Sequence, residues 1–163
     1  MFRKIYPLFI ALTALVFTMP VWSYDVDSAN AYAELFADAK GATTGKNLHL
    51  FPAEKFVDNI KTQKPMVVLD VRTPKETAIV SITLPGTLKV PLNELFSPES
   101  LSMLPQDKPI VVFCQSGVRS TAAATALRHI GFENAYVGKG GLKALINYLG
   151  PKQAYAPVKA ASK

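Results

Sequence analysis

One cysteine stands in a sequence context that makes a thiol reactive. Cys114, the single cysteine among the 163 residues, follows the apolar run Ile-Val-Val-Phe and precedes Gln-Ser-Gly-Val-Arg-Ser, where an alanine-rich helix is expected to begin. A short loop between a strand and a helix turns backbone N–H groups inward, next to the positive end of the helix dipole. These groups lower the pKa of a thiol below its free value of about 8.5. We therefore interpret Cys114 as a nucleophile, although a cysteine at the end of an apolar strand also serves as a small buried hydrophobe.

The residues after Cys114 are suited to an anion-binding loop. Gly117 gives the backbone the freedom that a tight cup requires. Arg119 carries a planar guanidinium, which either braces the rim of the loop or binds an anion as a fork. The inward N–H groups can hold an anionic substrate and the charge that develops on the attacked group. The loop thus favours a reactive thiol that can attack a bound anion.

The elements that must position the loop alternate between strands and helices. Continuous apolar runs end at Asp70 and at Cys114, and such runs are typical of parallel strands that helices cover on both faces. Apolar spacings of three and four, bounded by glycine or proline, indicate the helices. The alternation predicts an α/β fold with a mainly parallel sheet. The expected strands are 48–51, 66–69, 110–113 and 135–137, and the expected helices are 25–40, 52–60, 119–130 and 142–149.

Several motifs, taken in order, resemble those of the rhodanese-like sulfurtransferases. Residues 114–120 (CQSGVRS) resemble the active-site loop of that family, and residues 69–74 (LDVRTP) with Glu76 resemble its Asp-Val-Arg motif. Further matching segments are 84–86, 90–92, 131–132, 135–137 and 140–141. The resemblance covers about residues 47–150. It implies a single doubly wound α/β domain with a central five-stranded parallel sheet flanked by helices.

The resemblance also implies sulfur transfer through a persulfide. Cys114 would attack the outer sulfur of a small anionic donor such as thiosulfate, sulfite would leave, and cyanide or a thiol would take the sulfur from Cys114. In this scheme Cys114 and Arg119 are catalytic, and neither a metal nor an organic cofactor is needed. The other loop residues would bind the substrate: Gln115, Ser116, Gly117, Val118 and Ser120.

Three charged residues outside the loop are expected to support it. In the resembling family Asp70 and Arg72 mainly brace the fold around the loop, and Arg72 could form an ion pair with Glu76. The chain departs from the family pattern in residues 81–87, which lack the usual histidine. In addition, Gln115 and Ser116 are neutral where some members carry a cation, which leaves a polysulfide or persulfide donor open beside thiosulfate.

Other functions use the same type of residue. Related phosphatases of the dual-specificity type have five residues between the cysteine and the arginine, whereas four separate Cys114 from Arg119. The smaller cup suits a sulfur atom on cysteine better than a phosphoryl group, so we expect no useful phosphatase activity. A periplasmic sulfur carrier, which would pass a persulfide to a protein partner with little turnover of its own, needs the same thiolate. The intact loop argues against a catalytically silent scaffold.

The first residues have the pattern of a secretory signal peptide. Arg3 and Lys4 form a short basic start, residues 8–19 form an apolar run, and Pro20 precedes the small residue Ser23. A membrane span needs about 20 apolar residues, which favours a signal peptide of residues 1–23 over an uncleaved anchor. We expect export, most simply to a periplasm, without stable membrane insertion after cleavage.

Composition narrows the remaining possibilities. Behind the signal we expect an N-terminal helix and linker (24–46), the rhodanese-like domain (47–150) and a flexible basic tail (151–163). The formal net charge of +6 becomes +4 without residues 1–23, and the remaining cations are scattered, so no nucleic-acid partner is expected. His49 and His129 have no cysteine partners at zinc-binding spacing, so no structural zinc site is expected.

Overall fold

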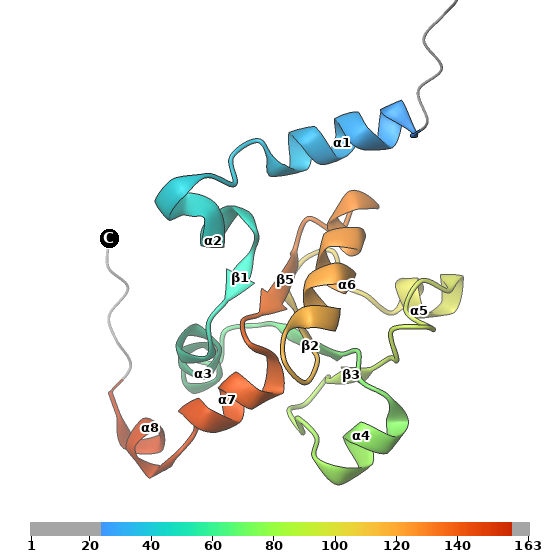
Figure 1. The fold of residues 1–163 in the computed structure, drawn as a ribbon. Coiled ribbons are helices and arrows are strands. Elements are labelled where there is room, and N and C mark those ends of the chain that lie inside the picture. Colours follow the sequence, from blue (N-terminus) through green and yellow to red (C-terminus); the bar gives the residue numbers. More distant parts are fainter. Residues whose placement is uncertain (1–23, 158–163) are drawn as a thin grey trace, which may run out of the picture.

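A five-stranded parallel sheet forms the centre of the protein, in a computed structural model that describes residues 24–157. The expected signal segment, residues 1–23, lies outside the described residues. The strands lie in the order β1-β5-β4-β2-β3, and every neighbouring pair is parallel (Figure 1). They are β1 (Leu50–Phe51), β2 (Val67–Asp70), β3 (Leu88–Lys89), β4 (Ile110–Phe113) and β5 (Ala135–Gly138). The predicted doubly wound α/β fold is confirmed.

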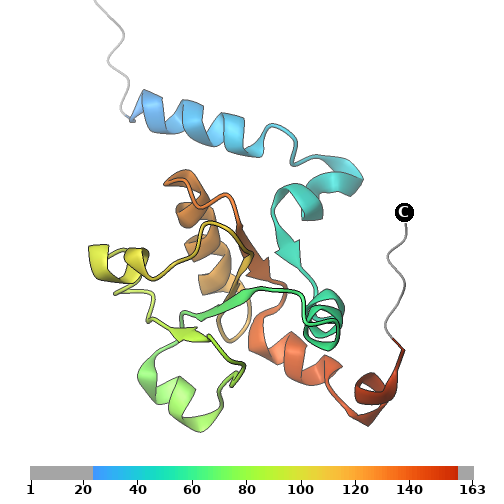
Figure 2. The same ribbon diagram turned by 180° about the vertical axis from the view of Figure 1, so that it is seen from behind.

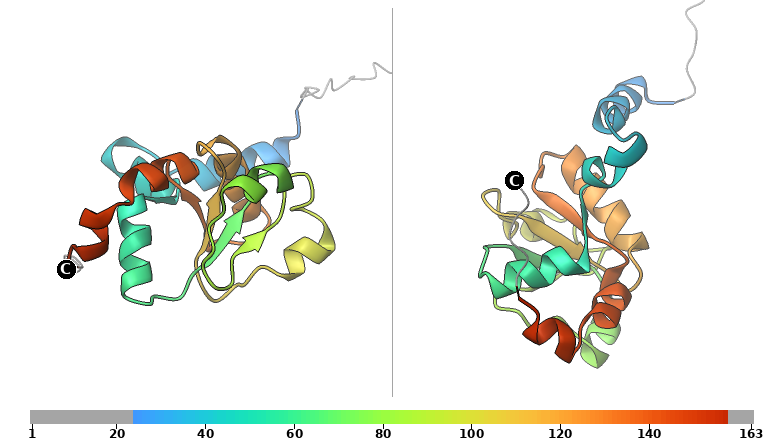
Figure 3. Two further views of the ribbon diagram at one scale, coloured as in Figure 1. Left: turned by 90° about the horizontal axis from the view of Figure 1, so that it is seen from below. Right: turned by 90° about the vertical axis from the view of Figure 1, so that its left-hand side faces the viewer.

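Helices cover both faces of this sheet. They are α1 (Val26–Phe36), α2 (Thr44–Asn47), α3 (Ala53–Lys61), α4 (Pro74–Ile79), α5 (Pro98–Ser102), α6 (Val118–His129), α7 (Gly141–Tyr148) and α8 (Pro151–Tyr155), with a short 3-10 turn at Gly41–Thr43. Figure 3 shows α6 on one side of the sheet and α3 on the other. None of the helices within residues 24–157 is long and apolar enough to cross a bilayer.

Two apolar layers hold the helices against the sheet. Alternate residues of β4 point to opposite faces, as the period of a strand requires. Ile110 and Val112 pack with α6 in one buried cluster, whereas Val111 and Phe113 pack with α3 and α7 in the other. All four residues are at most 2% exposed. Burial on both faces explains why β4 reads as an unbroken apolar run rather than an alternating one.

The N-terminal helix α1 stands away from the sheet. It contains no buried residue and contacts the far end of α6 (Figure 2). The sequence predicted this helix to run to residue 40, but it ends at Phe36. Gly41, expected to end it, instead has φ +58 and begins the 3-10 turn that leads into α2. The segment 41–46, expected to be a linker, is therefore partly helical.

The chain after residue 150 also differs from the expectation. Residues 151–155, expected to belong to a flexible tail, form α8, with Pro151 in the first turn, where its missing N–H costs nothing. The ammonium group of Lys61 donates to the backbone carbonyls of Gln153 and Ala156, the latter at 2.8 Å. These contacts connect α8 to the end of α3.

Candidate active site

Cys114 lies where the sheet and α6 meet. It follows β4, a central strand, and the helix α6 begins four residues later at Val118. Ligands of parallel α/β sheets bind beyond the carboxyl ends of the strands, and Cys114 stands at that edge. Gly117 caps α6 with φ +100, a conformation that a residue with a side chain rarely adopts. The tight turn predicted for Gly117 is therefore present.

Backbone N–H groups face the sulfur atom. The N–H of Gly117 donates to Cys114 Sγ at 3.1 Å. Burial acts to raise the pKa of the Cys114 thiol, but the N–H and hydroxyl of Ser120 and the N–H groups of Ser116 and Gly117 outweigh it and hold the pKa below its ordinary value. Hydrogen bonds to the charged form stabilise it, so the loop favours the thiolate.

The hydroxyl of Ser120 connects the sulfur to the backbone. Ser120 Oγ lies 3.6 Å from Cys114 Sγ and donates to the carbonyl of Gly117 at 3.0 Å. A hydroxyl has one proton to donate. When the thiol is neutral, it donates a hydrogen bond to Ser120 Oγ, and Ser120 donates to the Gly117 carbonyl. When the sulfur is a thiolate, the Ser120 hydroxyl can donate its hydrogen bond to the sulfur instead. Ser120 was predicted to bind substrate; the structure places its hydroxyl against Cys114 Sγ.

The sulfur atom of Cys114 is deeply buried. Cys114 is 1% exposed and belongs to the apolar cluster on the α6 face. Among the loop residues predicted to bind substrate, Gln115, Ser116 and Val118 are exposed, and Val118 is 76% exposed. Buried amides thus face the sulfur, while these three side chains form the outer surface of the loop. Lys139 of the neighbouring loop is also exposed.

The N-terminal turn of α7 fixes the loop from behind. The N–H groups of Leu142 and Lys143 donate to the carbonyls of Cys114 and Gln115, at 2.8 and 3.0 Å. Gly141, with φ +64, leaves so little space that an added Cβ would come within 2.5 Å of the Cys114 carbonyl oxygen. The glycine pair was noticed in the sequence only as a family match. This close backbone contact is its physical reason.

Arg119 braces the rim of the loop. Its guanidinium binds both carboxylate oxygens of Glu76 on α4, at 2.9 and 2.6 Å. The hydrogen bonds from Arg119, followed by those from Thr73, hold the pKa of the Glu76 carboxyl well below its usual range. The bond to Glu76 is also the main reason why the pKa of Arg119 is raised, and Cys114 contributes to that shift. Arg119 is therefore anchored by a carboxylate, and the Cys114 sulfur adds to the effects that raise its pKa.

The ion pair suggested between Arg72 and Glu76 is wrong. Arg72 instead binds Asp70, with Nη2 2.7 Å from Oδ2 and Nε 2.9 Å from Oδ1, and Nη2 also donates to the Val80 carbonyl at 2.7 Å. The two side chains are 2% and 1% exposed. Two residues apart at the end of β2, they turn to the same side, whereas Glu76 lies on α4 and faces Arg119. The pair fixes the β2–α4 connection, in line with the supporting role expected for both residues.

A cysteine that accepts hydrogen bonds from backbone N–H groups in the strand–helix loop of a parallel sheet is an arrangement that favours a thiolate. Within residues 24–157 no three His, Cys, Asp or Glu side chains gather as metal ligands. The model of the rhodanese-like domain family matches residues 52–147. The chain therefore belongs to the rhodanese-like domain family.

Known proteins share this region of the chain. The sulfurtransferase of Allochromatium vinosum is 28% identical over 92 residues, which are 56% of this chain and 82% of that protein. The probable adenylyltransferase/sulfurtransferase MoeZ of Mycobacterium tuberculosis is 35% identical over 94 residues, 58% of this chain and 24% of MoeZ. This chain thus spans about a quarter of the length of MoeZ. The crystal structure of a rhodanese-related protein from Thermoplasma volcanium, 33% identical, matches with a TM-score of 0.54 and covers 63% of this chain and 95% of its own.

Proposed function

We propose that the protein is a sulfurtransferase that carries sulfane sulfur as a persulfide on Cys114. The observation that carries this proposal is the sulfur environment: the Gly117 N–H lies 3.1 Å from Sγ, and the pKa of Cys114 is lowered despite burial. A cysteine that served only as core packing would have no reason to be surrounded by donors. Sulfurtransferases among its relatives support the same chemistry.

The first half-reaction loads the sulfur. The thiolate of Cys114 attacks the outer sulfur of a donor such as thiosulfate, a new S–S bond forms, and the old S–S bond breaks with its electron pair on the departing sulfite. The persulfide that results is again an anion, so the N–H groups that held the thiolate hold its product. Arg119, fixed by Glu76, adds a positive charge at the rim of the loop.

The second half-reaction returns the thiolate. An acceptor such as cyanide or a thiol attacks the outer sulfur of the persulfide, and the bonding pair returns to Cys114 Sγ. The exposed loop surface of Gln115, Ser116 and Val118 is neutral, which suits an organic persulfide or a polysulfide as well as thiosulfate. A protein acceptor could approach the same surface.

Loading with sulfur tests the proposal directly. The purified protein is treated with thiosulfate or polysulfide, and intact-protein mass spectrometry measures the added mass. We expect one sulfur atom per chain in the parent and none in Cys114→Ser. Thiosulfate–cyanide kinetics should fall roughly 10³-fold or more in Cys114→Ser, because the nucleophile is lost. Failure to load from any sulfane donor would sink the proposal.

The kinetics also separate a turnover enzyme from a carrier. Fast thiocyanate production indicates an enzyme that uses small donors and acceptors. Complete loading of Cys114 with slow turnover indicates a sulfur relay that requires a protein partner. A phosphatase would hydrolyse aryl phosphates in a Cys114-dependent way, and we expect no such hydrolysis.

We propose in addition that the protein acts outside the cytoplasm after loss of residues 1–23. The basic start and the apolar run at 8–19 support this. Expression of the full chain in a Gram-negative host, followed by fractionation and N-terminal sequencing, tests it. A mature chain beginning near Tyr24 in the periplasm is the expected result, and an intact chain in the membrane fraction would indicate the uncleaved anchor.

A further inference from the structure

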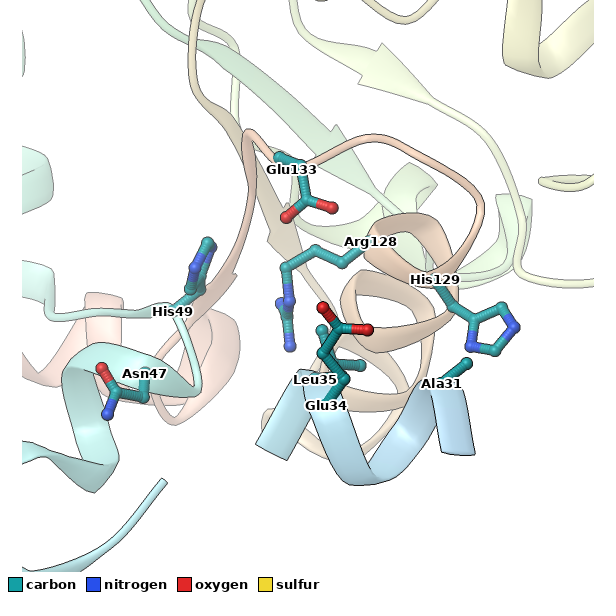
Figure 4. A pocket seen from close by; sticks show the side chains of 8 residues that line it. All are labelled: Ala31, Glu34, Leu35, Asn47, His49, Arg128, His129 and Glu133. Atoms are coloured by element: carbon teal, nitrogen blue, oxygen red, sulfur yellow. The ribbon is translucent and has the colours of Figure 1, made fainter. Parts of the chain in front are cut away.

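A cavity lies at the opposite end of α6 from Cys114. It measures about 460 Å³ and lies between α1, the segment that leads into β1, and the last turn of α6 (Figure 4). Its charged and polar lining includes Arg128, His129, His49, Glu34 and Glu133. A volume of this size is typical of small-molecule sites. At a rise of about 1.5 Å per residue, the twelve residues of α6 separate this cavity from the sulfur site by roughly 18 Å.

Among the described residues, Arg128 is a buried cation that forms no salt bridge, and only the charge of Glu133 acts on it from a distance. The residue is 3% exposed, and none of the carboxylates within residues 24–157 forms a salt bridge with it. Its Nη1 donates to the Ala135 carbonyl at 3.2 Å and its Nη2 to Thr125 Oγ1 at 3.4 Å, but its buried Nε has no partner. Burying an unpaired charge is costly, so this arrangement calls for an anionic group.

The guanidinium is aimed into the cavity. Figure 4 shows it between His49 and Glu34, below Glu133. His49 adds a second unsatisfied atom, because its Nδ1 is buried without a partner. Burial, and after it the charge of Arg128, lowers the pKa of His49. These effects favour the neutral imidazole, in which one ring nitrogen can accept a hydrogen bond.

Acidic side chains at the mouth decide which anion fits. Glu34 on α1 and Glu133 before β5 are both exposed. A sulfate or phosphate ion drawn to Arg128 would be repelled by these two carboxylates. A metal ion is not an alternative, since no three ligating side chains converge here or elsewhere in residues 24–157. A molecule that carries one negative and one positive group satisfies both the buried cation and the acidic mouth.

We propose that this cavity binds a small zwitterion of the α-amino-acid class, with its carboxylate on Arg128 and its ammonium group between His49, Glu34 and Glu133. Leu35 supplies an apolar wall for the side chain of such a ligand. A carboxylate matches the planar guanidinium better than a spherical anion does. The site is independent of the sulfur chemistry, because none of its residues belongs to the Cys114 loop.

The binding test uses L-leucine and its two halves. Isothermal titration calorimetry compares L-leucine with 4-methylpentanoate, which lacks the ammonium group, and 3-methylbutylamine, which lacks the carboxylate. We expect saturable binding of L-leucine with a Kd in the millimolar range or below, and at least about tenfold weaker binding of either half. The measurement is repeated in Cys114→Ser, where we expect the same Kd.

Variants at the two charged positions assign the binding to this cavity. Arg128→Met removes the buried cation and Glu34→Gln removes one exposed carboxylate; both should weaken L-leucine binding at least several-fold. Glu94→Gln changes an exposed acid elsewhere on the surface and should bind like the parent. Because Glu34 lies on a helix without buried residues, its variant tests the proposal even if Arg128→Met does not fold.

Each alternative outcome overturns the proposal. Equal binding of 4-methylpentanoate and L-leucine would make the site a carboxylate site without a zwitterion preference. Sulfate binding that exceeds L-leucine binding would make it an inorganic anion site. Binding unaffected by both variants would place L-leucine elsewhere, and no saturable binding of any of the four compounds would leave Arg128 with a structural role only.

Discussion

Arg72 and Arg128 are buried to the same degree, at 2% and 3% exposure, yet their surroundings differ. Arg72, at the end of the sheet that holds Cys114, binds both oxygens of Asp70 and the Val80 carbonyl. Arg128, at the other end of α6, has two long hydrogen bonds and an Nε with no partner. A satisfied buried charge holds a backbone in place, whereas an unsatisfied one is retained at a cost in stability and indicates a ligand.

The same difference in hydrogen bonding distinguishes the surroundings of the two ends of α6. Around Cys114 several polar groups have partners within the chain: Ser120 with Gly117, Arg119 with Glu76, and the N–H groups of Leu142 and Lys143 with loop carbonyls. The loop around Cys114 is therefore preorganised before a substrate binds. The end near α1 keeps open hydrogen-bonding capacity and an exposed helix. Substitutions at the two ends should therefore have opposite effects on stability.

The largest expected effect comes from Asp70→Asn. Removing the carboxylate leaves Arg72 as an uncompensated buried charge, which should lower the free energy of unfolding by about 3–5 kcal/mol. Arg128→Met is the matched change at the other end, and it should leave the free energy of unfolding nearly unchanged or raise it. Urea denaturation measures both. Equal losses in the two variants would break the comparison, because Arg128 would then be as fully satisfied as Arg72.

Gly141→Ala should have the next largest effect. A Cβ at this position would meet the Cys114 carbonyl oxygen at 2.5 Å and the Gly117 nitrogen at 2.7 Å, with φ +64 adding strain. We expect a loss of more than about 2 kcal/mol and slower sulfur loading, because the loop must shift. Gly131→Ala is the control, since it has φ +102 but no atom within 4 Å of the added Cβ. It should lose about 1–2 kcal/mol and load sulfur normally. Indistinguishable loading in the two variants would contradict a specific role of α7 in shaping the loop.

Ser120→Ala should move the pH profile of Cys114 alkylation upward by about one pH unit. The hydroxyl stabilises the thiolate, so its removal raises the pKa of the thiol. Losing a hydrogen bond worth about 1.4 kcal/mol corresponds to a rise of one pKa unit. At a pH below the pKa, the thiolate fraction then falls about tenfold. The pH dependence of alkylation measures this. Thr121→Ala removes the other hydroxyl bound to the Gly117 carbonyl without touching sulfur, and its pH profile should match the parent.

Glu76→Gln should have the smallest effect on stability. The Arg119 and Glu76 side chains are 34% and 32% exposed, and such pairs contribute about 0.2–1 kcal/mol. Because folding lowers the pKa of Glu76 from 4.5, the parent has this stability above about pH 4.5 and loses it as the pH falls further. Thermal unfolding of the parent and of Glu76→Gln at pH 7 and pH 3 measures the difference in stability between them, which should be smaller at pH 3. A difference that grows at pH 3 would contradict the assigned ion pair.

The sequence predicted the central elements because their signals are strong. The apolar runs that became β2 and β4 are buried on both faces of the sheet, so few polar residues interrupt them, and the alanine-rich α6 extends over twelve residues. The strand β3 was not predicted separately, since it has two residues, half-buried Leu88 and exposed Lys89. Only its pairing with β2 makes it a strand.

The helix α4 could have been recognised from the sequence. Thr73 and Glu76 form a capping box, with Pro74 in the first helical turn, and this pattern marks the start of a helix. The same Glu76 carboxylate also binds Arg119, across 43 positions of the chain. A tertiary contact of this kind leaves no local pattern, which is why the partner of Glu76 was predicted wrongly.

The sequence reveals more of the Cys114 loop than of the cavity near Arg128. The reactive loop is one continuous segment, so Cys114, Gly117 and Arg119 could be assigned from local residue types. The cavity near Arg128 combines α1, the segment before β1 and the end of α6. No motif joins these segments, and Arg128 in a last helical turn reads as a cation beside the helix dipole. Only the fold shows that its charge is buried.

The depth of the sulfur has a kinetic consequence. With Cys114 1% exposed, a donor or a peroxide can reach Sγ only after a local opening of the structure around it. Loading should then saturate at the frequency of this opening, however much donor is supplied. Amide hydrogen exchange at Gly117 reports that frequency, and oxidation of the thiol by peroxide should share the same ceiling.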